Sequence, residues 1–452
     1  MTKSADIVIC GAGIAGIAAA YHLTAAGVQD VLLIEAGEPL SLTSDKSTEC
    51  YRNFWPGPGD GMVRLVSRSL DLLEALAQQS GDAFHLNRRG YLYCTADSVR
   101  LQALQRAAAE SSALGAGAVR LHPGHSEAYG ASAAGPPLDG FDILSNSTLV
   151  HTHYPWLSET IIGALHVRRA GWFSAQQLGR LLLEQARTRG ARLLRGQLET
   201  VTTRGGRVES VRVATSAGTT HIATPVLVNA AGPWVCEVSR MMGIALPVYC
   251  ELHSKVSLPD VARTVPRDAP LTILDDPQTI EWAVEEQAAL REVGRGELLQ
   301  ELPGGLHARP EGPDGSPILL ALWPYNTPVE KPSFPLRFDE MYAEVVLRGL
   351  ERLLPAARVY RDRMPRTFVD GGYYTRTREN RPLIGPLEAQ GAFVLGALSG
   401  FGLMAAMGAG ELVSLHVMGA TLPEYARWFV PARYADRAYQ ALLPAIEGEG
   451  QL

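Results

Sequence analysis

Lysine is nearly absent from this sequence, and clusters of basic residues are missing. Only four of the 41 basic residues are lysines, namely Lys3, Lys46, Lys255 and Lys331. The net charge is −6 and no basic segment offsets it, which argues against nucleic acid as the main partner. The five cysteines are scattered and never form a C-x-x-C pair. This pattern predicts no disulfide framework, no bound metal and a cytoplasmic location.

We also expect no secretory signal, because no charged segment and small-residue cleavage site precede the first apolar strand. One uncharged stretch, residues 389–410, is long enough to cross a bilayer. It contains six glycines, and Ser399 and Gly400 lie in its middle. We interpret it as a buried strand, a glycine-rich turn and a buried helix, and we expect no membrane span. With 452 residues, 46% of them hydrophobic, the chain is long enough for two or three domains.

A glycine motif stands at the beginning of the chain. Residues 6–10 predict a short buried strand, which leads directly into G-x-G-x-x-G at Gly11, Gly13 and Gly16 and then into a helical run. The first glycine permits a tight turn, the second lets the main chain approach a pyrophosphate, and the third lets helix and strand pack closely. The N-terminus of the helix offers free N–H groups and partial positive charge to the phosphates.

An acidic residue completes this motif. A second predicted strand at residues 31–34 ends at Glu35, which can accept hydrogen bonds from the ribose hydroxyls and would repel a 2′-phosphate. Strand, glycine turn, helix, strand and acid in this order predict a dinucleotide site. The motif by itself leaves FAD and NAD open.

Two later segments favour FAD. Residues 225–234 predict an apolar strand that runs into a turn, and strand-like pieces at 192–223 precede it as a meander. Residues 381–404 combine an apolar strand with a glycine-rich turn, and a helix follows to about residue 418. A helix N-terminus aimed at the flavin edge would stabilise the negative charge of the reduced ring.

On these three blocks, residues 6–55, 170–235 and 365–418, the chain resembles the FAD-dependent oxidoreductases of the D-amino-acid oxidase superfamily, such as glycine oxidase, sarcosine oxidase and dimethylglycine dehydrogenase. The resemblance implies an α/β fold, α+β overall, with a glutathione-reductase-like FAD-binding Rossmann domain and a discontinuous substrate domain built on an antiparallel sheet. We predict an FAD-binding domain at residues 1–84, 166–238 and 364–452, and a substrate domain at 85–165 and 239–363.

The resemblance also implies a set of residues that bind FAD. They lie on the phosphate turn, the adenosine end, the loop after the second strand, the returning strand and the flavin end: Gly11, Gly13, Ile14, Ala15, Gly16, Glu35, Ala36, Ser44, Lys46, Ser47, Thr48, Leu198, Ala231, Gly232, Trp234, Gly400, Phe401, Gly402, Leu403 and Met404. Cys50 stands where dimethylglycine dehydrogenase has a histidine that binds its flavin. We expect Cys50 to be a buried, unreactive thiol and FAD to be bound non-covalently.

For the reaction, the resemblance implies hydride transfer to flavin N5 from a carbon next to the nitrogen of a small secondary or tertiary amine or an amino acid. Tyr374 stands where glycine oxidase has an arginine that binds the substrate carboxylate. Arg376 and Arg378 lie nearby and, on a strand, would share its face. His253 and Lys255 alternate in a strand-like run and would also share one face. These five residues are the catalytic candidates, and the expected electron acceptor is O₂ or an acceptor protein.

Alternatives stay open at this point. The chain could be an FAD-binding subunit of a larger complex, or an FAD-dependent 2-hydroxy acid dehydrogenase. His151 and His153 alternate in a stretch that we interpret as a strand, with no further ligands to support a metal. Residues 256–315 are rich in proline, glycine and charge, and we predict a long surface excursion or lid there.

Overall fold

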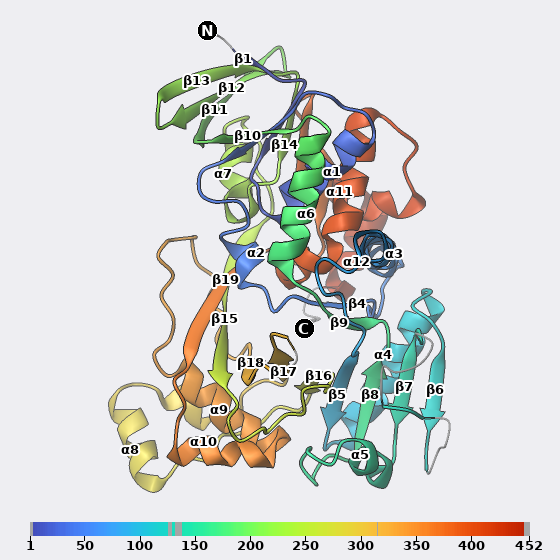
Figure 1. The fold of residues 1–452 in the computed structure, drawn as a ribbon, viewed down its shortest axis with the longest axis vertical. Coiled ribbons are helices and arrows are strands. Elements are labelled where there is room, and N and C mark those ends of the chain that lie inside the picture. The colour runs from blue at the N-terminus through green and yellow to red at the C-terminus, as the bar shows by residue number, and fades with distance from the viewer. Residues whose placement is uncertain (1–2, 125–128, 132–137, 314, 447–452) are drawn as a thin grey trace.

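The computed structural model describes residues 3–124, 129–131, 138–313 and 315–446, and it consists of two halves, each built on a sheet (Figure 1). The first half is centred on a six-stranded sheet in the order β10-β3-β2-β14-β21-β20. Its strands are β2 (Ile7–Cys10), β3 (Val31–Glu35), β10 (Arg192–Arg195), β14 (Val226–Asn229), β20 (Leu383–Pro386) and β21 (Ala392–Gly396). All neighbours in it run parallel except β20 and β21.

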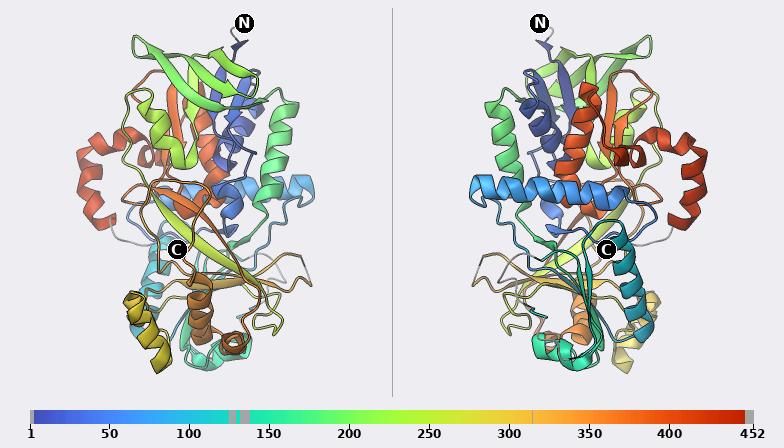
Figure 2. Two further views of the ribbon diagram at one scale, coloured as in Figure 1. Left: turned by 90° about the vertical axis from the view of Figure 1, so that its left-hand side faces the viewer. Right: turned by 90° about the vertical axis from the view of Figure 1, so that its right-hand side faces the viewer.

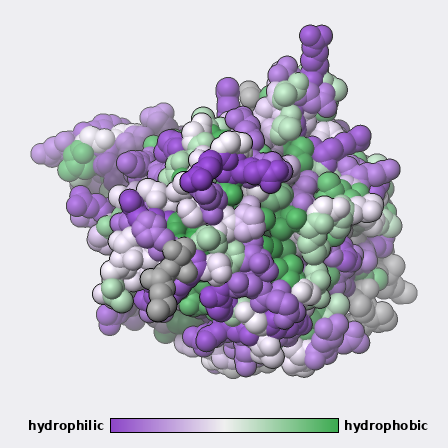
Figure 3. Space-filling view, turned by 90° about the horizontal axis from the view of Figure 1, so that it is seen from above, coloured by the Kyte–Doolittle hydropathy of each residue, from purple (hydrophilic) through white to green (hydrophobic). Residues whose placement is uncertain are grey.

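The two faces of this sheet follow from the alternation of its apolar side chains. In β2, Ile7 and Ile9 pack with the helices, whereas Val8 and Cys10 pack with a second sheet. The helices are α1 (Ile14–Ala25), α3 (Gly61–Ser80), α6 (Ala175–Thr188) and α11 (Gly402–Met418). The second sheet has the order β1-β13-β12-β11, with β1 (Lys3–Ser4), β11 (Gln197–Arg204), β12 (Arg207–Thr215) and β13 (Gly218–Ala223). Seen from above, this end of the molecule is largely hydrophilic, with apolar atoms gathered in a central strip (Figure 3).

The second half is a nine-stranded sheet in the order β19-β15-β18-β17-β16-β5-β8-β7-β6. Most neighbours run antiparallel, and the pairs β16–β5 and β6–β7 run parallel. The strands are β5 (Tyr91–Thr95), β6 (Val119–His122), β7 (Phe141–Leu144), β8 (Gly163–Val167), β15 (Tyr249–Pro259), β16 (Leu271–Leu274), β17 (Leu306–Glu311), β18 (Ile318–Leu322) and β19 (Phe368–Arg376).

Alternation decides the faces here as well. Tyr91 and Tyr93 of β5 pack towards the six-stranded half, whereas Leu92 and Cys94 pack into a separate core on the far face. The helices of the second half are α4 (Ser98–Ala113), α5 (Ser147–His153), α8 (Val284–Glu292), α9 (Tyr342–Leu353) and α10 (Val359–Asp362). Side views show the two halves one above the other, with α3 lying crosswise near their boundary (Figure 2).

Short elements connect the halves. A two-stranded antiparallel sheet joins β4 (Cys50–Arg52) to β9 (Ala170–Trp172). The remaining helices are α2 (Thr43–Lys46), α7 (Val235–Arg240) and α12 (Arg437–Ile446). The predicted division into domains stays a prediction. Strand β19 belongs to the nine-stranded sheet although it follows the predicted boundary at residue 364, β8 spans the boundary at 165–166, and residues 447–452 lie outside the described part.

The apolar stretch 389–410 contains the predicted strand, turn and buried helix. Strand β21 leads through a single turn, η4 (Ser399–Phe401), into α11, which packs against α1 and α3. Residues 399–418 are long and apolar enough to cross a membrane by composition, and 67% of the apolar window is buried inside the protein.

Two predictions were wrong. His151 and His153 lie in helix α5 rather than in a strand. The Asn146 side chain accepts a hydrogen bond from the main-chain N–H of Leu149 at 3.1 Å, and this cap begins a helix that the short alternating pattern hides. Residues 256–315 are not a surface lid. They contribute the end of β15 and the whole of β16 and β17 to the interior of the nine-stranded sheet, because buried apolar residues there outweigh the prolines and glycines that flank them.

Candidate functional site

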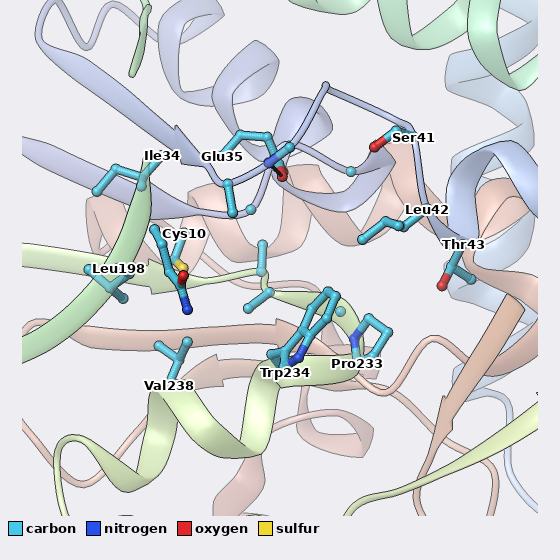
Figure 4. A pocket seen from close by; sticks show the side chains of 18 of the residues that line it. Cys10, Ile34, Glu35, Ser41, Leu42, Thr43, Leu198, Pro233, Trp234 and Val238 are labelled. Carbon is cyan, nitrogen blue, oxygen red and sulfur yellow. Dashed lines mark hydrogen bonds between the residues drawn. The ribbon is translucent and has the colours of Figure 1, made fainter. Parts of the chain in front are cut away.

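A cavity of about 470 Å³ lies at the carboxyl ends of the parallel strands, and we call it the dinucleotide groove (Figure 4). Its lining includes Gly11 and Gly13 of the glycine turn, Glu35 and Ala36 after β3, and Leu198, Ala231, Gly232 and Trp234. Trp234 and Val238 point into it from one side and Leu42 from the other. Residues far apart in the sequence, all but Val238 and Leu42 predicted for FAD, therefore meet in one groove.

The glycine turn has the two steric constraints that the motif predicts. Gly11 has φ +103°, and a Cβ atom there would stand 2.4 Å from the carbonyl oxygen of Ala230. A Cβ atom on Gly16 would stand 2.0 Å from the carbonyl oxygen of Gly11. Both distances are far below van der Waals contact, so the tight turn and the close packing of α1 on the sheet each require glycine.

The N-terminus of α1 faces the groove. Gly13 is the N-cap of α1, and the N–H of Ile14 donates to the Ser44 Oγ at 3.0 Å. A Cβ atom on Gly13 would come within 3.3 Å of that same oxygen. The N–H groups of the first turn, the Ser44 hydroxyl and the positive end of the helix form a cradle that fits a diphosphate.

Glu35 has a second use that the sequence did not reveal. Its Oε2 accepts a hydrogen bond from the N–H of Ala12 and its Oε1 from the N–H of Gly37, both at 2.8 Å. The carboxylate therefore holds the glycine turn against the end of β3 while it lines the groove. The position fits the predicted contact with a ribose, and the apolar Leu198 and Val238 fit the adenine end.

A middle cavity of about 110 Å³ continues from the groove, with which it shares Gly13, Ser44 and Gly232. It also contacts Ile14, Ala15 and Ser47, and at its other end Gly400, Gly402 and Leu403 at the beginning of α11. A Cβ atom on Gly400 would lie 2.4 Å from the ring of Tyr374. The glycine thus lets the beginning of α11 approach β19 of the nine-stranded sheet, as the flavin end of a dinucleotide would require.

An inner cavity of about 80 Å³ follows, which shares Tyr374, Ser399 and Gly400 with the middle cavity. Segments from both halves line it: Thr48, Cys50, Arg52, Tyr91, His253, Leu271, Ile273, His307, Leu322, Pro324, Tyr374, Arg376, Ser399, Gly400, Phe401 and Met404. The three cavities form one path from the adenine end of the groove to the nine-stranded sheet.

Three of the catalytic candidates meet in the wall of the inner cavity. The ring of His253 stacks on Tyr374 with centroids 3.8 Å apart and an interplanar angle of 15°. Its Nε2 donates to Oε2 of Glu251 at 3.1 Å, and Nη1 of Arg376 donates to the same oxygen at 2.6 Å. Burial raises the pKa of Tyr374 to about 12, so the phenol is neutral at physiological pH.

The other candidates lie outside this cavity lining. Arg378 follows the end of β19 and is exposed. The Lys255 Nζ donates to the main-chain oxygen of Ser47 at 2.8 Å, beneath the loop rather than in the cavity. Lys46, which was predicted to bind FAD, forms ion pairs with Asp45 and Asp370 and lines a separate cavity of about 350 Å³.

Two basic residues of the inner cavity, Arg52 and His307, were not among the predicted site residues. Arg52 ends strand β4, and only 5% of its surface is exposed. A single charge within the apolar run 50–55 is the signal that could have identified it. His307 lies in β17, and its Nδ1 donates to the carbonyl oxygen of Gly305 at 2.9 Å, which leaves Nε2 as an acceptor. Burial lowers the pKa of His307 to about 4. Its segment was interpreted as a lid, so no pattern pointed to it.

The sequence matches the protein-family model described as FAD dependent oxidoreductase (DAO) over residues 6–414. Among curated proteins, mitochondrial sarcosine dehydrogenase of Mus musculus is 24% identical over 265 residues, which cover 57% of this chain and 26% of that protein. Mitochondrial dimethylglycine dehydrogenase of Mus musculus is 23% identical over 412 residues, which cover 91% of this chain and 42% of that protein. The chain therefore spans less than half the length of these relatives.

Solved structures show the same fold. L-proline dehydrogenase from P. horikoshii has a TM-score of 0.73 at 19% identity, and the likeness covers 96% of this chain and 99% of that one. Glycine oxidase from Geobacillus kaustophilus has a TM-score of 0.71 at 18% identity, with 95% and 99% covered.

Proposed function

The chain belongs to the family of FAD-dependent oxidoreductases, and from this premise we propose that it oxidises a small secondary or tertiary amine that carries a carboxylate group. The observation that carries the proposal is Arg52. This arginine is buried at the inner cavity, and among the residues that the structure describes its guanidinium has neither a carboxylate partner nor a hydrogen bond. The rings of Trp55 and Tyr91 lie 4.9 and 5.8 Å from its guanidinium carbon.

A buried guanidinium without a counter-ion is costly, because the charge has lost its water and gained nothing equivalent. The planar fork of Arg52 matches a carboxylate, with which it can form two parallel hydrogen bonds. A carboxylate on the substrate would therefore supply the missing partner. The curated relatives named for sarcosine and dimethylglycine, and the solved structures named for proline and glycine, are compatible with such a substrate.

The path of cavities fits FAD. The N-terminus of α1 with Ser44 would hold the diphosphate, Glu35 and Leu198 the adenosine, and Gly400 to Leu403 the ring end. When bound, FAD supplies a flavin ring that accepts a hydride from the carbon beside the amine nitrogen. The inner cavity lies next to that ring end, so a substrate held by Arg52 would lie beside it. Attachment is proposed to be non-covalent.

Two neutral imidazoles offer acceptor nitrogens to the substrate amine. Because the carboxylate of Glu251 can only accept, His253 donates through Nε2 and keeps Nδ1 as an acceptor. In the same way, His307 donates through Nδ1 to Gly305 and keeps Nε2 as an acceptor. Burial lowers the pKa of His253, although its hydrogen bond with Glu251 acts in the opposite direction. Either ring can accept a hydrogen bond from the nitrogen of the substrate amine and orient it, and the amine must be neutral before its lone pair can assist hydride departure.

The remaining wall of the inner cavity excludes water. Leu271, Ile273, Phe401 and Met404 are apolar and buried, and they line the side away from the polar groups. We further propose that the electrons pass on to O₂ or to an acceptor protein, in the cytoplasm. The five cysteines are all unpaired, which supports a reducing compartment.

The test is anaerobic reduction of the purified, FAD-loaded protein, followed by the visible absorbance of its flavin. Matched pairs isolate the carboxylate: sarcosine against dimethylamine, and L-proline against pyrrolidine. Glycolate tests a 2-hydroxy acid. We expect bleaching by at least one carboxylated amine and none by its partner without the carboxylate. Bleaching by glycolate alone, or by both members of a pair at equal rates, would overturn the proposal, and reoxidation in air identifies O₂ as acceptor.

A further inference from the structure

The loop at residues 47–50, which we call the cavity loop, lines both the middle cavity and the inner cavity. Ser47 lines the middle cavity, and Thr48 and Cys50 line the inner cavity. Between them, Glu49 has φ +62°, a left-handed conformation that is uncommon for any residue except glycine. Such a conformation persists only where the surroundings hold the chain firmly in place. The contacts around the loop therefore need an explanation.

Two cations from the nine-stranded sheet hold consecutive carbonyl groups of this loop. Arg309 of β17 donates to the main-chain oxygen of Thr48 through Nε at 3.1 Å and through Nη2 at 2.7 Å. Lys255 of β15 donates through Nζ to the main-chain oxygen of Ser47 at 2.8 Å. We infer that Arg309 and Lys255 are a pair of positioning residues that fix the cavity loop for FAD binding and for the shape of the inner cavity.

The surroundings of Arg309 keep its fork in one orientation. Only 1% of its surface is exposed, and its guanidinium carbon lies 5.0 Å from the ring centre of Trp172. Nη2 also contacts a carboxylate oxygen of Glu311 at 2.6 Å. Glu311, on the same strand, thus balances the positive charge of Arg309, and the planar guanidinium remains directed at the loop. A lysine could not make both hydrogen bonds to Thr48 with the same geometry.

The other half of the molecule holds the same loop from the opposite side. The Glu49 Oε1 accepts a hydrogen bond from the N–H of Ala175, the first residue of α6, at 2.7 Å. The main-chain oxygen of Glu49 accepts from the N–H of Phe173 at 3.1 Å. The cavity loop is therefore fixed between α6 of one half and β15 and β17 of the other. Its position, and with it the position of Thr48 and Cys50, depends on how the halves meet.

This inference concerns cofactor retention and does not rest on the substrate proposed above. The test compares Arg309→Met, Lys255→Met and the double variant with the unmodified protein. Removal of FAD and titration with fresh FAD gives the dissociation constant from flavin fluorescence. We expect each single variant to raise it about tenfold, because a hydrogen bond to a charged group is lost. The double variant should raise the dissociation constant by less than the product of the two single-variant increases, since both residues act on one loop. The visible spectrum of bound flavin should shift.

Arg267→Met is the matched control. Arg267 also donates to main-chain oxygens, those of Ile318 at 2.8 Å and Glu311 at 2.6 Å, but these belong to the sheet and not to the loop. We expect it to lower the melting temperature of the FAD-free protein without a change in FAD affinity or spectrum. Arg309→Lys should recover part of the affinity that Arg309→Met loses. Equal FAD affinities for Arg309→Met, Lys255→Met and Arg267→Met would overturn the inference, whatever substrate the enzyme oxidises.

Discussion

Small residues such as glycine, alanine and serine make up about half of the lining of the dinucleotide groove, whereas side chains from eight separate stretches of the sequence line the inner cavity. At the groove, Gly11, Gly13 and Gly16 matter because they have no side chain, and the N-terminus of α1 faces the groove. In the inner cavity, Arg52, His253 and His307 act through charge and hydrogen bonding. The first arrangement suits a cofactor that is the same in many proteins, and the second suits a substrate that differs.

This difference predicts how substitutions behave in each region. A change in the groove alters the backbone path and should affect folding and FAD together. A change in the inner cavity alters one interaction and should affect the reaction while the fold survives. Four experiments examine that contrast.

The largest effect is expected from Gly11→Ala. Gly11 and Gly27 stand on either side of α1, and both have positive φ, +103° and +94°. A Cβ atom on Gly11 would collide with the main chain at Ala230, whereas one on Gly27 would meet nothing within 4 Å. We expect Gly11→Ala to abolish FAD retention. Gly27→Ala should keep its FAD and lose only about 1 kcal/mol of stability from backbone strain. FAD content after purification and thermal melting give the answer, and equal FAD content in the two variants would contradict this role of Gly11.

Arg52→Met should have the next largest effect, and a different kind of effect. Loss of a charge-assisted contact to the substrate carboxylate should raise KM for a carboxylated amine about a hundredfold. An amine without the carboxylate should show little change. Because Arg52 is buried without a counter-ion in the described residues, methionine should leave the melting temperature unchanged or raise it. A fall in melting temperature with an unchanged KM would make Arg52 a structural residue.

The sequence predicted the groove far better than the cavity, for a physical reason. The residues from Gly11 to Glu35 are consecutive parts of one strand–helix–strand unit, so their spacing alone places them together. Gly400 was predicted because a glycine turn before an apolar helix is also a local pattern. In both places the main chain would make the contacts to FAD, and a short local sequence pattern is enough to predict the path of the main chain.

Arg52 and His307 illustrate why the cavity escaped. They meet only because β4 lies beneath a sheet whose strands are ordered β19-β15-β18-β17-β16-β5, an order that the sequence does not follow. Strand β16 pairs with β5 although the two are far apart in the sequence, with Leu271 opposite Tyr91, and no local pattern indicates that pairing. Tyr374 was predicted from the resemblance to glycine oxidase. Arg376 and His253 were predicted because alternation along a strand gives the face of a residue, although it does not give what lies opposite.

A smaller effect concerns acid stability, with one histidine from each half. Burial lowers the pKa of His22 on α1 and of His307 on β17 to about 4, from an ordinary value of about 6.5. Between about pH 4 and pH 6.5, these two rings therefore bind protons in the unfolded chain but not in the folded protein. The stability from each neutral ring is complete above about pH 6.5 and is lost as the pH falls towards 4, by up to about 3 kcal/mol per ring.

His22→Leu and His307→Leu should each make the free energy of unfolding fall less steeply over that range in urea titrations. Only His307→Leu should also lower kcat/KM, because His22 lies far from the cavities along α1. If both variants lowered kcat/KM equally at neutral pH, the loss could not be assigned to a group in the inner cavity.

The smallest effect is expected from Cys50→Ser, which compares a thiol of the inner cavity with Cys10 in the groove. Burial raises the pKa of Cys10 to about 12 and raises that of Cys50 as well. The Cys50 Sγ donates to the main-chain oxygen of Thr48 at 3.1 Å. Both groups are therefore thiols at neutral pH, and a thiol attacks a flavin ring far more slowly than a thiolate does. Acid precipitation of the FAD-loaded protein should release all its flavin, and Cys50→Ser should bind FAD as the unmodified protein does. If flavin stayed with the precipitate, and Cys50→Ser released it, Cys50 would be bound covalently to the cofactor. A side chain of the inner cavity would then hold FAD, and the contrast between a main-chain site for FAD and a side-chain site for substrate would no longer hold.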